Sequence, residues 1–406
     1  MKILHINVCA SSGSTGKIVT SISKILGEKG HKAIICYGAN EFVNAEGYFR
    51  FCSEPVRAIN AITSRLTGIM YGGFLNWSTN KLIKKIISET PDIVHIHCIN
   101  GFTVDVFKLL EFLAENSYNT VLTLHAEFMF TGLCSHAFDC LKWKIEGCHS
   151  CQRSKSISKS FFDQSSYSWR KLKKAYTLFA TTKLKVVSVS PWLSHRADES
   201  VMLHRFDKYV VFNGINTDIF HYISSKPNNS SHNIPEKFCL FVTASFSVDK
   251  DDNKGGFFLV ELAKRNPAIQ FVVASNYSRP VDYLPNNITL LGKAKTQEEL
   301  SRLYNLANVS LLLSKRETFS MVTAESLCCG TPVVGFKAGG PESITLKEYS
   351  EFSEYGDLDT LEKILINWFD KPVDKKKISD KAVSKYSENA MTSAYMDIYK
   401  SFANII

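Results

Sequence analysis

Two glutamates near the end of the chain, Glu317 and Glu325, are separated by seven residues in the stretch RETFSMVTAESLCCGTPVVG, residues 316–335. An apolar run, VSLLL at 309–313, precedes them, and a second one, PVVG, ends the stretch. Short apolar runs of this kind predict buried strands, and the segment between them predicts a loop followed by a helix. The two carboxylates are therefore expected just beyond the end of a buried strand.

The predicted helix begins at Phe319 and Ser320, after a loop over 314–318. A helix N-terminus carries free N–H groups and the positive end of the helix dipole, so a phosphate is its natural ligand. Glu317 would lie on the loop, and Glu325 would reach from the first turns of the helix toward a ligand with hydroxyl groups. The alternative is that Glu325 only complements the helix dipole.

A second candidate site is the glycine-bearing turn SSGSTGK at 11–17. It is not a P-loop, because Gly13 and Gly16 are too close together and Ile18 follows Lys17. It also lacks the G-x-G-x-x-G pattern of dinucleotide-binding turns. A glycine turn between a first strand and a first helix still allows the backbone to approach a sugar or phosphate closely.

Four cysteines and two interleaved histidines lie within residues 131–151. The chain has 11 cysteines and no recognisable secretion signal, which favours a reducing compartment and a structural zinc site over disulfides. The first cysteine pair is spaced C-x5-C, which is looser than usual, so reduced buried cysteines are the alternative. The zinc ligands of this hypothesis are Cys134, Cys140, Cys148 and Cys151.

Short β-rich runs alternate with helical stretches from the start of the chain. The runs are continuous rather than alternating in polarity, as is typical of strands that are covered on both faces of a parallel sheet. Those of the first half are KILHINV (2–8), AIICYG (33–38), DIVHIHC (92–98), TVLTLH (120–125), KVVSVS (185–190) and YVVFNG (209–214).

A polar stretch, HYISSKPNNSSHNIPE, interrupts this series and predicts a linker, after which a second alternating series begins. The sequence therefore predicts two doubly wound, Rossmann-like α/β domains, with a ligand cleft between the carboxyl ends of both sets of strands. The predicted boundaries are 1–220 for the N-terminal domain with the insert 131–151, 221–236 for the linker, 237–370 for the C-terminal domain and 371–406 for C-terminal helices.

Length and composition agree with two domains and with a protein outside the bilayer. The chain has 406 residues, 45% of them hydrophobic, and single cores stop growing at about 250 to 300 residues. The longest apolar runs are well below the ~20 residues that a membrane-spanning helix needs. We therefore expect a cytoplasmic protein.

The positive charge of the chain lies in its first half. Residues 1–215 contain 26 Lys and Arg against 16 Asp and Glu, a net charge of +10, whereas the remainder has 22 against 23, or −1. The runs KLIKK (81–85) and WRKLKK (169–174) are each explained as solvated helix faces. The asymmetry itself favours a phosphate-bearing partner, an anionic membrane surface or, on charge alone, a nucleic acid.

Five motifs, taken together and in order, resemble those of glycosyltransferase family 4, and the likeness covers nearly the whole chain. The resemblance implies the two-domain GT-B fold and a retaining transferase that uses a nucleoside diphosphate sugar and requires no metal on the diphosphate. The motifs are SSGSTGK (11–17), VFNGIN (211–216), DNKGG (252–256), ETFSMVTAESLCCGTPVV (317–334) and AGGPES (338–343).

The resemblance assigns roles to the residues of the C-terminal domain. Glu317 would lie by the donor sugar, and Glu325 would hold the ribose hydroxyls. The N–H groups of Phe319, Ser320 and Met321 would hold the pyrophosphate.

Lys254 matches the lysine of the family's Lys-Gly element, which supplies a positive charge for the diphosphate leaving group. The family often has an arginine a few residues earlier, where this chain has SVDKDDN, and Lys250 is the cation that could replace it. This departure matters because two cations normally offset the charge on the departing phosphate.

In the N-terminal domain the resemblance points to Gly13, Ser14 and Gly16, which would lie across the cleft from the donor. His125 falls where the family keeps a histidine near the transferred sugar. A single histidine at a strand end is otherwise more often structural.

The combined reading is a retaining glycosyltransferase of bacterial surface-polysaccharide biosynthesis, such as that of capsule, exopolysaccharide or O-antigen. Its acceptor is expected to be a glycan linked to a lipid diphosphate, and its position the inner face of the plasma membrane, held by anionic lipid. One alternative is a GT-B epimerase or phosphorylase. Another is a nucleic-acid-binding protein built on the cysteine cluster and the basic half, which would leave Glu317, Glu325 and Lys254 without a use.

Overall fold

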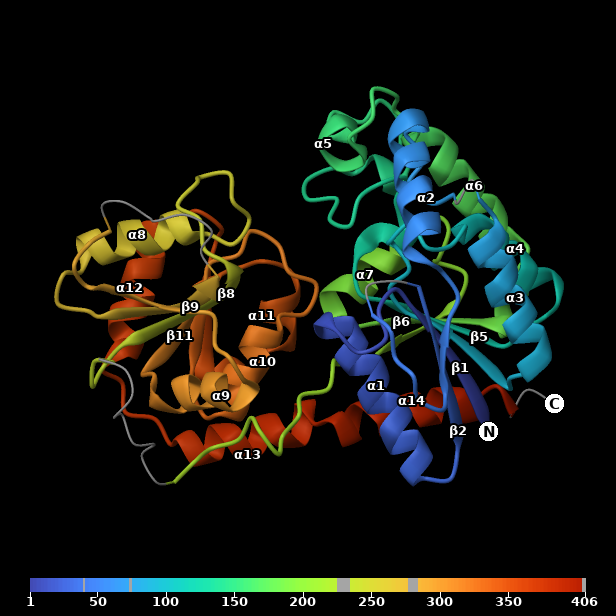
Figure 1. Cartoon of the computed structure of the whole chain (residues 1–406). Helices are drawn as coiled ribbons and strands as arrows, with labels where there is room; N and C mark the ends of the chain where they lie inside the picture. The colour runs from blue at the N-terminus through green and yellow to red at the C-terminus, as the bar shows by residue number, and fades with distance from the viewer. Residues whose placement is uncertain (39–40, 73–74, 225–233, 277–283, 404–406) are drawn as a thin grey trace. The chain divides into compact units, whose positions relative to one another are not determined.

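The computed structural model describes residues 1–38, 41–72, 75–224, 234–276 and 284–403 (Figure 1). The chain forms two compact units, of which unit 1 is Met1–Phe212 with Met391–Ile406 and unit 2 is Asn213–Ala390. The predicted linker at 221–236 lies in unit 2, and its residues 225–233 are outside the described part of the chain.

Unit 1 contains a seven-stranded sheet in the order β3-β2-β1-β4-β5-β6-β7, in which every pair is parallel. From β1 the chain adds β2 and β3 on one side, and it then adds β4 to β7 on the other side of β1. The strand order therefore reverses between β1 and β4. The strands are β1 (Lys2–Asn7), β2 (Lys32–Tyr37), β3 (Tyr48–Arg50), β4 (Ile93–Ile96), β5 (Thr120–Leu124), β6 (Leu184–Ser188) and β7 (Asp207–Val210).

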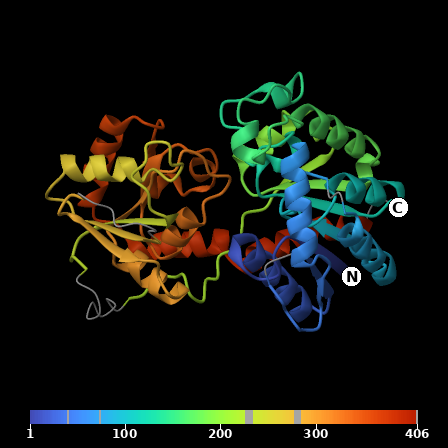
Figure 2. The same ribbon diagram turned by 45° about the horizontal axis from the view of Figure 1, so that its top comes forward.

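Helices cover both faces of this sheet (Figures 1 and 2). In α1, Ile18, Ile22 and Leu26 recur at helical spacing and are buried in the same core as Ile3 of β1 and Met391 of α14. The helices of unit 1 are α1 (Gly13–Glu28), α2 (Glu54–Thr67), α3 (Trp77–Glu89), α4 (Val106–Glu115), α5 (Ser154–Ser158), α6 (Ser165–Thr177), α7 (Pro191–Asp198) and α14 (Glu388–Lys400).

Unit 2 repeats the arrangement with a six-stranded parallel sheet in the order β10-β9-β8-β11-β12-β13. Here β8 and β11 flank the reversal point. The strands are β8 (Cys239–Ser245), β9 (Phe271–Asn276), β10 (Ile288–Gly292), β11 (Val309–Leu312), β12 (Val333–Phe336) and β13 (Ser350–Ser353). The helices are α8 (Gly256–Arg265), α9 (Gln297–Leu306), α10 (Met321–Cys328), α11 (Gly340–Ile344), α12 (Leu358–Phe369) and α13 (Lys375–Tyr386).

The C-terminal helices, predicted as one group at 371–406, divide between the units. Helix α13 packs on unit 2, where Ser379 Oγ donates a hydrogen bond to the carbonyl of Cys328 in α10. Helix α14 belongs to unit 1 from Met391 onward, and its Tyr395 and Tyr399 are buried in the core of that unit.

The predicted pair of doubly wound α/β domains is confirmed, and each sheet has the strand order typical of dinucleotide-binding folds. The cleft expected between the domains stays a prediction. Within the described ranges, no helix is both long and apolar enough to span a bilayer.

Candidate functional site

The candidate site of unit 2 lies at the carboxyl ends of β8 and β11, the two strands that flank the reversal of strand order. Ligands of doubly wound sheets bind at this kind of position. Lys254 follows β8 and Glu317 follows β11, although 62 residues separate them in the sequence. The sheet topology therefore brings both predicted residues to one place.

Lys254 and Glu317 form an ion pair, with Lys254 Nζ donating to Glu317 Oε1 at 2.6 Å. The side chains remain accessible, Lys254 being 41% exposed and Glu317 22% exposed. Gly255 is left-handed, with φ of +78°, and a Cβ there would collide with the carbonyl oxygen of Leu313. The glycine after Lys254 is thus required for the turn to pack against the end of β11.

The loop that carries Glu317 is fixed by the motif AGGPES. Glu317 N donates to the carbonyl of Ala338 at 3.0 Å, and Gly340 N donates to the carbonyl of Glu317 at 2.8 Å. A Cβ at Gly340 would collide with the carbonyl of Thr318. Glu342 accepts from the N–H groups of Ala338 and Gly339, so its role is structural.

The N-terminus of α10 follows this loop, with Ser320 as the N-cap and Met321 as the first helical residue, slightly later than the predicted start at Phe319. Ser320 has φ of +82°, which is rare for a residue other than glycine, and its Oγ accepts from Thr323 N at 3.2 Å. Phe319 is buried and contacts the ring of Tyr386 edge-on. Such backbone strain concentrates at functional sites, and here it places the first turn of α10, from Met321, directly after Glu317.

Glu325 lies farther along α10 and is only partly buried. The hydroxyl of Tyr304 donates to Glu325 Oε2 at 3.3 Å. Burial, with the charge of Glu325 as a further cause, raises the pKa of Tyr304 well above its usual value, so the phenol keeps its proton and can donate. The sequence carries no local signal for Tyr304 as a partner of Glu325.

Lys250, considered as a second cation, lies over the ring of Phe257 at 4.9 Å from Nζ to the ring centre. Its described contact is therefore a cation–π interaction with α8. No described contact ties Lys250 to Lys254 or Glu317.

The glycine turn of unit 1 follows β1, again beside the reversal of strand order. Gly13 begins α1 with φ of +68°, Ser14 is exposed, and a Cβ at Gly16 would collide with the backbone of Ser11. The turn does not present an empty anion site, because Glu41 fills it. Its carboxylate accepts from Ser11 N at 3.0 Å and from Ser12 N at 2.8 Å.

These contacts change the acidity of Glu41. Partial burial would raise its pKa, but the hydrogen bonds from Ser11 and Ser12 outweigh burial and lower it. The turn thus binds a carboxylate in this structure, which agrees with a preference for anions. Glu41 was not identified from the sequence.

His125 follows β5, and its Nε2 lies 3.3 Å from His97 Nδ1. Burial lowers the pKa of His125 to about 4, so the imidazole is neutral. His97 was missed in the sequence, where the alternation of His95 and His97 in DIVHIHC could have indicated that two histidines share one face of a strand.

The cysteine segment is held by a buried ion pair that the sequence did not reveal. Arg196 of α7 donates to Glu127, which is fully buried and also accepts from Ala137 N at 2.6 Å. The Arg196 guanidinium stacks on Trp143 at 4.9 Å. These contacts tie Ala137 and Trp143 of the segment to the buried Glu127 and to α7.

The four cysteines of that segment lie near one another as free thiols. Cys148 interacts electrostatically with Cys140 and Cys151, and the hydrogen bond between Cys134 and Cys151 lowers the pKa of Cys151 to about 6. In the ranges covered by the structure, however, the group whose potential ligand atoms all lie within 4.8 Å of one another is His5, His95 and His97. The zinc site stays a prediction.

The amino-acid sequence is similar to those of known glycosyltransferases. Residues 253–386 match the family model described as "Glycosyl transferases group 1". An uncharacterized glycosyltransferase of Methanocaldococcus jannaschii is 28% identical over 42% of this chain and 46% of its own length. N-acetyl-alpha-D-glucosaminyl L-malate synthase of Bacillus anthracis is 33% identical over 18% of this chain and 19% of its own. The chain spans less than half the length of these curated relatives.

Solved structures match along the whole chain. Sucrose-phosphate synthase of Thermosynechococcus elongatus covers 100% of both chains at 14% identity, with a TM-score of 0.70. Anabaena HepE in complex with UDP covers 99% of this chain and 100% of its own at 14% identity, with a TM-score of 0.64. The chain therefore has the GT-B fold, and the part of unit 2 that holds Lys254, Glu317 and Glu325 lies within its match to the glycosyl transferases group 1 model.

Proposed function

We propose that this protein is a retaining glycosyltransferase that moves a sugar from a nucleoside diphosphate sugar to a hydroxyl of a glycan acceptor. The observation that carries the proposal is the accessible Lys254–Glu317 pair at the N-terminus of α10. This pair lies at the reversal of strand order, within the segment that matches the glycosyl transferases group 1 model.

The chemistry follows from the charges at this place. The bond between the anomeric carbon and the diphosphate oxygen breaks, and the acceptor oxygen bonds to the same carbon and loses its proton to the departing diphosphate. Lys254 and the N–H groups of the first turn of α10 would stabilise the charge that develops on the diphosphate. Glu317 would position the sugar, and Glu325 would accept from the ribose hydroxyls. None of these roles requires a metal.

A nucleotide donor is supported by a structural relative, since Anabaena HepE has been solved with UDP and with UDP-glucose. The test is a thermal-shift panel of nucleoside diphosphates and their sugars. A ligand at 100 times its Kd stabilises a protein by about 2.7 kcal/mol, which is readily detected. We expect one nucleotide series to raise the melting temperature of the wild type and of the control Lys264→Ala, but not of Lys254→Ala.

Two outcomes would overturn this function. One is a panel in which no nucleotide stabilises the wild type. The other is a first product whose anomeric linkage, read by NMR, is inverted relative to the donor, which would remove the retaining mechanism.

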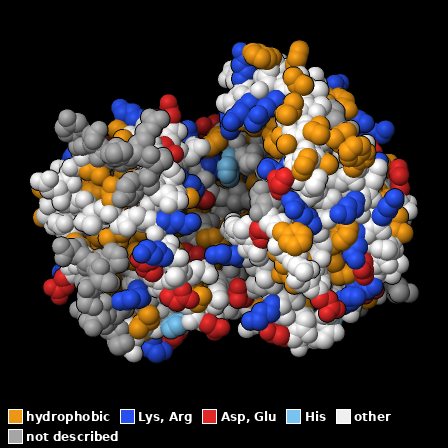
Figure 3. Space-filling view, viewed as in Figure 1, with side chains coloured by type: hydrophobic (Ala, Val, Ile, Leu, Met, Phe, Trp, Pro, Cys, Tyr) orange, Lys and Arg blue, Asp and Glu red, His pale blue; other side chains and the backbone are white. Residues whose placement is uncertain are grey.

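The acceptor is proposed to be lipid-linked, with the enzyme docked on an anionic membrane, because unit 1 exposes an apolar and basic patch. Helix α2 exposes Ile62 at 54% and Leu66 at 67%, beside the exposed Arg65. Phe161 is 90% exposed, and Lys155 lies over its ring. Figure 3 shows hydrophobic and basic side chains gathered on the part of unit 1 where α2 and α5 lie in Figure 1.

The end of α2 and the segment with Phe161 and Phe162 are neighbours, because a Cβ at Gly68, the residue after α2, would collide with the carbonyl oxygen of Phe162.

The basic run KLIKK should contribute less to the attraction for anionic lipid than its charge suggests, because two of its lysines have partners in the protein. Lys81 donates to the carbonyl of Arg50, and Lys85 pairs with Glu89 at 2.7 Å. Exposed aromatic rings beside lysines suit the interface of an anionic bilayer, where each basic residue contributes about 1 kcal/mol.

Sedimentation with vesicles tests the docking. We expect the wild type to bind anionic but not neutral vesicles at low salt, and to be released by high salt. The double variant Phe161→Ser with Phe162→Ser should lose most of this binding, while Ile366→Ser, on the exposed side of α12, should keep it. Binding that ignores lipid charge, or a wild type that never sediments, would remove the membrane from the proposal.

A further inference from the structure

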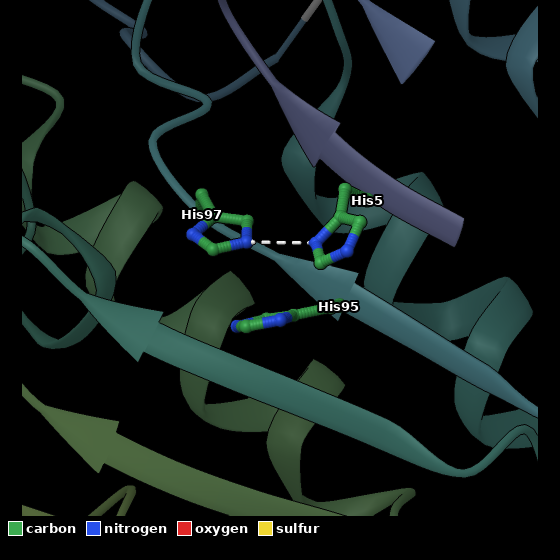
Figure 4. A group of neighbouring side chains, drawn as sticks. All are labelled: His5, His95 and His97. Atoms are coloured by element: carbon green, nitrogen blue, oxygen red, sulfur yellow. Dashed lines mark hydrogen bonds between the residues drawn. The ribbon is translucent and has the colours of Figure 1, made fainter. Parts of the chain in front are cut away.

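Three buried histidines of unit 1 lie close together on one face of the sheet of that unit, at the neighbouring strands β1 and β4. His5 of β1 and His95 of β4 are partners in the parallel register, and His97 lies two residues after His95, on the same face. Figure 4 shows the three rings close together. All three side chains are at most 1% exposed. Such a group in a protein core needs an explanation, because burying imidazoles without partners is costly.

Hydrogen bonds join two of these rings to His125, the predicted site residue at the end of β5. His5 Nδ1 lies 3.1 Å from His97 Nε2, and His97 Nδ1 lies 3.3 Å from His125 Nε2. The rings of His97 and His125 are nearly parallel, with an angle of 27° between them. A continuous chain of imidazoles thus runs from the middle of β1 to the end of β5.

His95 supports this chain from the side. Its Nδ1 lies 2.7 Å from the hydroxyl of Tyr399 in α14, and its Nε2 lies 2.7 Å from Thr123 Oγ1. Thr123 in turn contacts the hydroxyl of Tyr395 at 3.0 Å. Both nitrogens of His95 are therefore occupied by hydroxyl groups, and its ring serves as a packing surface for His5 and His97.

A metal site is the first reading of three clustered histidines, and the ring geometry argues against it. A metal must lie in the plane of each ligating ring, about 2.0–2.1 Å from the nitrogen. The rings of His95 and His97 instead overlap, with centres 3.8 Å apart and an angle of 32° between planes. Since His95 also uses both nitrogens elsewhere, the hydrogen-bonded chain accounts for the arrangement better than a metal does.

The protonation of the chain follows from burial. Burial lowers the pKa of His5 to about 3 and that of His125 to about 4, and it lowers the pKa of His97 well below its usual value. Each ring is therefore neutral and carries one N–H. Two arrangements satisfy both hydrogen bonds: every proton on Nδ1, with donation from His5 toward His125, or every proton on Nε2, with donation in the opposite direction.

The surroundings of His5 Nε2 distinguish between these two arrangements of protons. This atom is buried and has no hydrogen-bond partner within the part of the chain that the structure covers. With protons on Nε2, a buried N–H of His5 would be left without an acceptor, and such orphaned donors are rarer in proteins than unsatisfied acceptors. With protons on Nδ1, only a lone pair is left unsatisfied.

We propose that His5 and His97 are positioning residues that hold His125 as a neutral imidazole with its proton on Nδ1. His125 then presents an N–H on its Nδ1 side and is not a general base. The consequence for catalysis rests on the proposed function. In that reaction, His125 would not take up the acceptor proton, which would pass to the departing diphosphate.

The test is NMR of the full chain with 15N-labelled histidine, in which coupling patterns and nitrogen shifts separate the two neutral tautomers from the imidazolium. The signals of His125 are identified by their loss in His125→Gln. We expect a single neutral species protonated at Nδ1, unchanged between pH 5.5 and 8. The Nε2-protonated form or an imidazolium at pH 7 would overturn the proposal.

Variants of His97 test whether its hydrogen bond, rather than its bulk alone, sets the tautomer of His125. His97→Leu should leave His125 as a mixture of tautomers, whereas His97→Asn should retain most of the Nδ1 form because its amide can donate in place of Nδ1–H. The exposed His204→Leu is the matched control. If His97→Leu does not fold, the wild-type spectrum alone still decides.

Two further results complete the test. Stoichiometric metal in the wild type that disappears in His5→Leu would replace the chain by a metal site. A protein without transferase activity, but with the expected spectrum, would overturn the proposed function and leave the tautomer assignment intact.

Discussion

At the scale of single residues, the proposed function requires Lys254 to bind a diphosphate although its side chain is paired with Glu317. Both side chains are partly exposed, and ion pairs of this kind contribute only about 0–1 kcal/mol. A diphosphate carries more charge than a carboxylate and forms stronger charge-assisted hydrogen bonds. If the proposed donor binds, its diphosphate would displace Glu317 from Lys254 at little cost in free energy, and Glu317 would then be available to the sugar.

Removing either partner of the ion pair should therefore slow the proposed reaction. Lys254→Ala and Glu317→Gln should each lower turnover at least ~100-fold, the loss expected when one electrostatic contact at a developing charge is removed. Both side chains are too exposed for either change to prevent folding, so the melting temperature without ligand should stay near that of the wild type. Steady-state rates with the donor found in the nucleotide panel measure the effect. A folded variant with wild-type turnover would exclude that residue from the site.

At the scale of helices and strands, the sequence predicted the central elements because they are buried on both faces. The apolar runs at 2–8, 92–98 and 309–313 could be read directly as strands. The edge strands β3 and β13 were missed because they are short and only partly buried, so they lack such a run. Partners that come together only through topology, such as Glu41 on the glycine turn, leave no local signal.

The cysteine segment is the element whose chemistry remains a prediction. If Cys134, Cys140, Cys148 and Cys151 close a tetrahedral shell, the purified protein should contain about one zinc, measured by elemental analysis without chelator in the buffers. Cys140→Ser should lower zinc content, and Cys239→Ser, in the core of unit 2, should not. Wild-type protein with far less than one zinc would identify the cysteines as reduced thiols.

At the scale of the whole molecule, the two units differ in what they bury. The sequence places nine of its 11 histidines in the first 212 residues, and unit 1 buries His5, His95 and His97 as neutral rings. Unit 2 has Lys254 and Glu317 at the surface and a described histidine, His221, that is exposed. The units are therefore expected to respond differently to acid.

The last prediction is that unit 1 loses stability below neutral pH while unit 2 does not. The folded pKa of His5 is about 3, against 6.5 for the unperturbed side chain, so between these values the unfolded chain binds more protons than the folded one. The free energy of unfolding of unit 1 then falls as pH falls through this window, by about 2 kcal/mol for His5 alone at pH 5, with His95, His97 and His125 acting in the same direction.

Denaturant unfolding at pH 7.5 and 5.0 measures this effect. We expect two transitions, one whose midpoint falls at pH 5.0 and one whose midpoint does not change. Tryptophan substitutions in each unit assign the transitions. His5→Gln should reduce the shift of the first transition. Equal shifts of both transitions, or a unit 1 as stable at pH 5.0 as at pH 7.5, would contradict the buried neutral chain of histidines.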